Sequence, residues 1–220
     1  MKRLTFVFAV LLAATITAAA QADSPKPSQA QSSRPSQPAT QSSPTGQPAQ
    51  SQTAQAPATL SSVVDREVSN YERLMVNAAE AMPEEKFNFN PASLNLPGAQ
   101  FHDVRTFATL IKHTASANYF FWGAVSGEKP PENIKSSEGP EELKTKAEII
   151  QFLKDSFAAG HRAAKMLTPE NAFEQVQFLQ FRGPRLYMAT NAVIHCADEY
   201  GQMVEYLRMN GIVPPASAGR

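Results

Sequence analysis

Two side chains near the C-terminus have the spacing of a metal-binding pair. His195 and Glu199 are four residues apart, so on a helix both emerge from one face about one turn apart. An imidazole and a carboxylate in this arrangement can chelate one divalent metal ion. The same pair also occurs as a simple surface hydrogen bond, and spacing alone leaves both interpretations open.

His113 is a third candidate ligand, in a different segment of the chain. It lies among Leu110, Ala117 and Phe120, where an imidazole needs a partner to offset its lost hydration. If this segment neighbours the one that carries His195 and Glu199, the three residues form a set of two histidines and one carboxylate. Such a set holds a divalent metal and leaves coordination positions open for water or substrate.

Four stretches have apolar residues at intervals of three and four, which predicts amphipathic helices. We expect these helices over residues 62–82, 106–127, 145–168 and 184–210. The apolar segment 173–181 fits a short extended stretch or a helical turn equally well. No alternating strand pattern of comparable length occurs, so the predicted fold class is all-α, an antiparallel four-helix bundle. Its unequal connections allow simple up-and-down order or a crossover.

Capping signals support these helix starts. Ser62 with Asp65 predicts a capping box for the first helix, and Thr145 with Glu148 predicts one for the third. Thr106 is expected to cap the second helix.

The N-terminus has the pattern of a secretory signal. Lys2 and Arg3 precede an apolar run over residues 4–16, and small residues follow up to Ala22. The run is shorter than the about 20 apolar residues that a membrane-spanning helix needs. We therefore predict a cleaved signal peptide over 1–22, with an uncleaved anchor as the alternative. The expected location is exported, periplasmic or secreted, without an integral membrane segment after cleavage.

A spacer is predicted between the signal and the helical region. Residues 23–58 consist mainly of Ser, Pro, Gln, Ala and Thr and have almost no large apolar side chain. Such a stretch cannot bury enough surface to offset the entropy lost on ordering. We expect a disordered linker over 23–58 and a folded domain over 59–220.

The charge balance narrows the class of partner. Lys and Arg total 20, and Asp and Glu also total 20, so no overall basic field is present to attract nucleic acid. Neutrality favours a small-molecule substrate or ligand, or a protein partner.

The other reactive side chains have simpler interpretations. Cys196 is the single cysteine and cannot form an internal disulfide; its place on the core face favours a buried inert thiol over a nucleophile. His161 is expected at the edge of its helix, and His102 in a cap or loop. Asp198 points about 100° around the helix from Glu199 and is expected to face solvent.

Two strings resemble one known family. They are LIKHTASANYFFWGAVSGEKPP over 110–131 and NAVIHCADEYGQMVEYLRMNGIVPPAS over 191–217. Both resemble the DinB-like family of metal-dependent helical bundles, which includes bacterial thiol transferases. The similarity extends from Leu60 to the C-terminus. It implies a four-helix bundle with a divalent metal held by one histidine of the second helix and two histidines, four apart, of the last.

In this resemblance His113 and His195 match the first two ligands, and Glu199 replaces the third histidine. A carboxylate can ligate Zn, Ni, Fe or Mn, so the substitution is compatible with a retuned site. A lineage that kept the fold without the metal is the alternative.

The resemblance implies a metal that lowers the pKa of a bound water or thiol. The corresponding activity is a hydrolase or a thiol-dependent transferase acting on a small molecule. A non-catalytic binding or structural bundle is the alternative from another class, and a homodimer is compatible with the resemblance.

Overall fold

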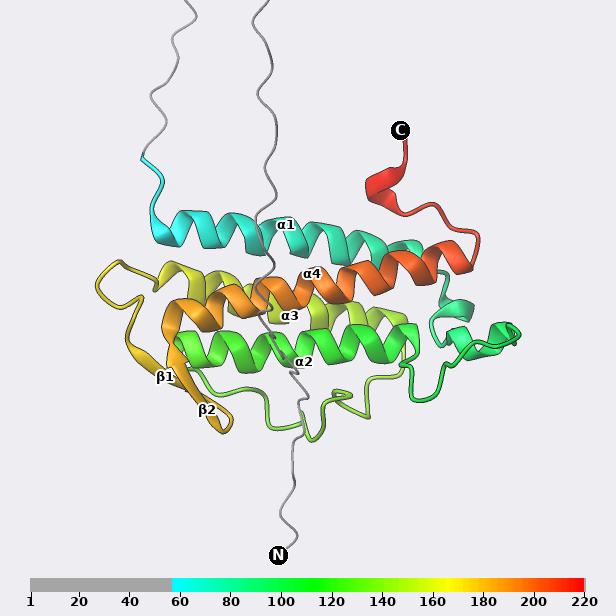
Figure 1. Cartoon of the computed structure of the whole chain (residues 1–220), viewed down its shortest axis with the longest axis horizontal. Coiled ribbons are helices and arrows are strands. Elements are labelled where there is room, and N and C mark those ends of the chain that lie inside the picture. Colours follow the sequence, from blue (N-terminus) through cyan, green and yellow to red (C-terminus); the bar gives the residue numbers. More distant parts are fainter. Residues whose placement is uncertain (1–56, 220) are drawn as a thin grey trace, which may run out of the picture. The chain divides into compact units, whose positions relative to one another are not determined.

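The computed structural model describes residues 57–219 and confirms the all-α class (Figure 1). Its long helices are α1 (Leu60–Ala81), α2 (Phe107–Ser126), α3 (Lys146–Lys165) and α4 (Arg185–Met209). Short 3-10 turns occupy Glu84–Lys86, Pro91–Leu94 and Pro215–Ser217. The predicted signal peptide over 1–22 and all but the last two residues of the predicted linker lie outside the described residues.

The order of the helices follows the crossover alternative. Helices α1 and α4 run in one direction and α2 and α3 in the other (Figure 1). Helix α2 packs against α3 and α4, and α1 packs against the same two helices. The connection from α2 to α3 therefore returns along the bundle before α3 begins.

The α2 helix is the central element of the core. Its buried residues include Phe107, Leu110, Ile111 and Trp122, as expected for a helix that is apolar nearly all round. Trp122 packs directly against α3, where a side-chain carbon on Gly160 would lie 2.8 Å from the indole nitrogen. The absence of a side chain at that glycine lets the two helices approach closely.

A buried polar chain crosses the bundle from α4 to α3. The Cys196 thiol donates to Asn118 Oδ1 at 3.2 Å, and the Asn118 amide donates to Ser156 Oγ at 3.2 Å. Ser156 Oγ donates in turn to the Leu153 carbonyl at 2.7 Å. Each buried polar group thus has a partner, which limits the free-energy cost of its burial.

Two of the three predicted helix caps are confirmed. Thr106 caps α2, and Thr145 with Glu148 forms the capping box of α3. The expected box of Ser62 and Asp65 is wrong: Thr59 is the N-cap of α1, and Ser62 is the reciprocal partner three residues later.

The undecided segment 173–181 is extended in its central part. Strand β1 (Gln175–Phe178) pairs antiparallel with β2 (Phe181–Pro184), and Phe178 lies opposite Phe181. The turn residue Leu179 has a φ of 50°. Across residues 57–219, no helix is long and apolar enough to span a bilayer.

His161 links α3 to α1. Its Nδ1 lies 2.6 Å from Asp65 Oδ1 and its Nε2 lies 3.0 Å from Glu72 Oε2. Carboxylates accept hydrogen bonds, so both contacts are satisfied together when the ring carries two protons. Partial burial disfavours that charged form, but the two carboxylates outweigh it and raise the pKa of His161 above its usual 6.5.

We expect His161→Asn to lower the free energy of unfolding most below about pH 6.5. A raised folded-state pKa contributes stability that is fully present below the unfolded-state value and is lost as pH rises through the folded-state value. Urea denaturation from about pH 5.5 to 8.5 measures the difference between wild type and variant. His102→Asn, in an exposed turn, is the control, and a His161→Asn difference that does not shrink with pH contradicts the prediction.

Candidate metal centre

The structure brings His113 of α2 together with His195 and Glu199 of α4. One potential ligand atom from each residue lies within 4.8 Å of the other two. Glu199 Oε1 is 3.5 Å from His113 Nε2 and 3.7 Å from His195 Nε2. The predicted neighbourhood of the three side chains is therefore present.

Helix geometry and antiparallel packing account for this arrangement. His195 and Glu199 share one face of α4, and that face packs against α2 at the level of His113. The two imidazole rings meet edge to face, with centroids 5.2 Å apart. The side chains of His113 and Glu199 are 6% and 5% exposed, whereas that of His195 is 21% exposed, so solvent reaches part of the His195 ring although its Nε2 atom is buried.

Two further contacts orient the side chains of His113 and Glu199. His113 Nδ1 lies 2.6 Å from the Ser137 carbonyl oxygen, which can only accept a hydrogen bond. The proton of a neutral His113 ring is therefore on Nδ1, and the Nε2 lone pair faces α4. The Gln202 amide donates to Glu199 Oε2 at 3.2 Å, which leaves Oε1 directed at the histidines.

The residues fit a shared metal ion. The side-chain atom His195 Nε2 is buried and has no hydrogen-bond partner among the described residues. Its 3.7 Å separation from Glu199 Oε1 is too long for a hydrogen bond. Two atoms that ligate one ion at about 2.1 Å in tetrahedral geometry lie about 3.4 Å apart. The observed separations are thus closer to those of co-ligands than to those of direct partners.

An aromatic wall borders the group on one side. The Phe121 ring centroid is 6.0 Å from that of His195, and Phe178 of β1 stacks on Phe121 at 4.3 Å with a 10° interplanar angle. Burial lowers the pKa of His195, and the neighbouring Glu199 carboxylate opposes this shift without cancelling it.

Other residues considered in the sequence lie outside this group. Asp198 and His102 are exposed, and His161 pairs with carboxylates of α1. Ser137, Gln202 and the β1–β2 hairpin were not anticipated. Gln202 lies three residues after Glu199 on the same helix, a spacing that could have suggested its role. Ser137 contributes a backbone carbonyl from a loop, which no side-chain pattern indicates.

Comparison with known proteins identifies the family. The model of the DinB superfamily matches residues 70–206, which is more than half of the chain and includes all three candidate ligands. The chain belongs to the DinB superfamily. No curated protein matches this DinB-superfamily chain.

Solved structures of DinB-like proteins share its fold. One from Bacillus cereus ATCC 10987 has 15% sequence identity and a TM-score of 0.51, with 68% of this chain and 89% of that chain covered. Another from Bacillus subtilis has 14% identity and a TM-score of 0.51, with 68% and 92% covered. At these identities the likeness establishes the four-helix fold.

We expect Cys196 to be unreactive in the folded protein although it adjoins His195. The residue is 3% exposed, and burial raises the pKa of its thiol to about 12. A thiol-specific chromogenic reagent should therefore label it slowly in buffer and stoichiometrically in denaturant. Rapid labelling of the native protein contradicts the prediction and indicates that α4 moves away from α2.

Proposed function

We propose that this DinB-superfamily protein binds a divalent transition metal through His113, His195 and Glu199. The observation that carries the proposal is the convergence of three ligand atoms, one of which is a buried imidazole nitrogen that has no hydrogen-bond partner in the part of the chain that the structure describes. A cation at this point gives that nitrogen a partner and offsets the buried charge of Glu199.

The ligand set favours Zn, Fe, Mn or Ni. Imidazole nitrogen suits all four ions, and a carboxylate oxygen adds affinity for the harder members of the group. Three protein ligands leave at least one position open, as in catalytic rather than structural sites. His195 is the most exposed of the three side chains, which favours access to the ion from its side.

The proposed activity is metal-dependent hydrolysis, or thiol-dependent transfer, on a small molecule. A metal bound here would lower the pKa of a coordinated water or thiol. Ser137 and Gln202 hold His113 and Glu199 in place, and the Phe121–Phe178 stack supplies an apolar wall beside His195. The proposed exported location, periplasmic or secreted, favours the hydrolase because reduced thiols are chiefly maintained in the cytosol.

We expect near-stoichiometric metal in the wild-type protein and its loss in His113→Ala and Glu199→Ala. Each substitution removes one of three ligands, and the remaining two bind a divalent ion more weakly. The measurement is elemental mass spectrometry on full-length protein without a histidine tag, both as purified and after loading with Zn, Ni, Mn or Fe(II).

His102→Ala and His161→Ala are matched controls, because each removes a histidine outside the proposed centre. Both should retain the metal content of the wild type. Failure of wild-type protein to hold any of the four ions overturns the proposal and leaves the non-catalytic bundle.

A further inference from the structure

The connection between α2 and α3 returns along α2. Because these helices run in the same direction, residues 127–145 span roughly the length of one helix, about 30 Å. Residues 136–140 of this connection, hereafter the strap, contact Arg105 just before α2 and the turn of α2 that carries His113. The strap is the part of the connection that contributes to the proposed centre.

Two side chains fasten the strap directly after its contact with His113. Arg105, just before α2, forms two hydrogen bonds with the Glu138 carboxylate, at 3.1 and 2.9 Å. On α2 itself, the Lys112 ammonium donates to the Pro140 carbonyl at 3.0 Å. Immediately before these two attachments in the chain, the Ser137 carbonyl accepts a hydrogen bond from His113 Nδ1–H.

Gly139 lets the strap backbone lie directly on α2. Its φ of 78° belongs to the left-handed region that glycine adopts readily. A side-chain carbon here would lie 2.7 Å from Lys112 Cβ and 2.9 Å from the Lys112 carbonyl oxygen. These distances are shorter than a non-bonded contact allows, and the oxygen belongs to the helix backbone, so the strap rather than α2 would have to move.

We propose that the strap is a positioning element for the metal centre. Close approach at Gly139 keeps the Ser137 carbonyl on His113 Nδ1–H, and this hydrogen bond keeps Nε2 directed at His195 and Glu199. The partner is a backbone oxygen, so the placement of the strap controls His113, and the Ser137 hydroxyl contributes a hydrogen bond of 3.1 Å to Glu138 within the strap. The effect on metal affinity rests on the proposed function, whereas the effect on the His113 ring is a property of the metal-free protein.

Gly139→Ala tests this role, with Gly98→Ala as its matched control. Gly98 has the same φ of 78° but nothing within 4 Å of a side-chain carbon, so alanine there adds backbone strain without a clash. In full-length protein, Zn²⁺ affinity measured by competition with a chromophoric chelator should fall about 10- to 100-fold for Gly139→Ala, the usual effect of losing a ligand's outer partner. Gly98→Ala should bind Zn²⁺ as the wild type does.

A metal-free readout separates this proposal from the proposed function. ¹⁵N NMR of the His113 ring distinguishes a proton on Nδ1 from one on Nε2. Wild type and Gly98→Ala should show the Nδ1–H form of neutral His113, and Gly139→Ala should show a mixture. This comparison stands even if wild-type protein binds no metal, a result that would overturn the proposed function alone.

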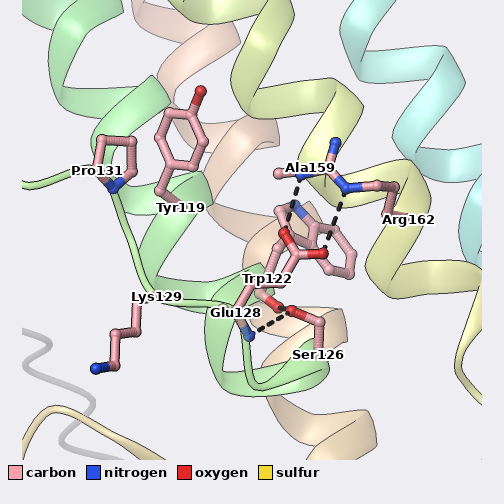
Figure 2. A pocket seen from close by; sticks show the side chains of 9 residues that line it. Tyr119, Trp122, Ser126, Glu128, Lys129, Pro131, Ala159 and Arg162 are labelled. Carbon is pink, nitrogen blue, oxygen red and sulfur yellow. Dashed lines mark hydrogen bonds and ion pairs between the residues drawn. The ribbon is translucent and has the colours of Figure 1, made fainter.

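Glu138→Gln and Glu128→Gln form a second matched pair. Glu128, at the start of the same connection, is bound to Arg162 of α3 by hydrogen bonds of 3.3 and 2.9 Å (Figure 2). That pair borders a pocket of about 250 Å³ that none of the three candidate ligands lines. Glu138→Gln should weaken Zn²⁺ binding and broaden the His113 signals, and Glu128→Gln should change neither.

Circular dichroism measures whether each variant folds. If Gly139→Ala fails to fold, the comparison of Glu138→Gln with Glu128→Gln tests the proposal. The proposal is overturned if a folded Gly139→Ala protein retains the His113 Nδ1–H signal and the Zn²⁺ affinity of Gly98→Ala. It is also overturned if Glu128→Gln and Glu138→Gln change both readouts equally.

Discussion

The buried carboxylate of Glu199 is the constraint on which the centre of this bundle depends. Glu199 is 4% exposed, and removing an ionised carboxylate from water costs several kcal/mol unless nearby groups compensate. Gln202 donates one hydrogen bond at 3.2 Å, and the two imidazole nitrogens lie 3.5 and 3.7 Å away, beyond good hydrogen-bond distance. A positive charge nearby would offset this cost, and a metal ion among these atoms would supply it.

The contact of α2 with α4 therefore differs from its contact with α3. On the side of α4, His113 faces Glu199, and His195 is the most exposed of the three candidate ligands. On the other side, Asn118 joins Ser156 of α3 in a buried chain whose hydrogen bonds are made within the protein. The Trp122 ring occupies the space that a side chain on Gly160 would take. The α2–α3 contact is thus a completed interface, whereas the α2–α4 contact contains ligand atoms whose spacing suits an ion.

Features of the sequence that depend on helical periodicity were predicted well. Spacing alone placed His195 and Glu199 on one face of α4, and the apolar surroundings of His113 placed it on a central helix. The resemblance to the DinB-like family brought the two segments together. The first cap was misplaced because both Thr59 and Ser62 can cap a helix, and only the backbone shows that Thr59 is extended.

Features that depend on the path of a loop were not predictable in this way. The contact with His113 is made by the carbonyl of Ser137, a group that every residue has, so the letter at position 137 carries no signal. The glycine at position 139 does not by itself indicate a close contact with α2, because a glycine between polar residues is also typical of an ordinary turn. The stacking of Phe178 on Phe121 similarly depends on the path of the β1–β2 hairpin.

The geometry also weighs against a bundle that has the fold but has lost its ion. Without a cation, His195 Nε2 is a buried nitrogen lacking a hydrogen-bond partner within the described residues, beside a carboxylate that is largely removed from water. Both features destabilise the fold, and apolar side chains of similar volume would remove the penalty. Protonation of a histidine would offset the charge, but burial lowers the pKa of His195 and opposes this solution. A divalent ion would satisfy the nitrogen and the carboxylate together, which favours the proposed metal-binding interpretation over the structural one.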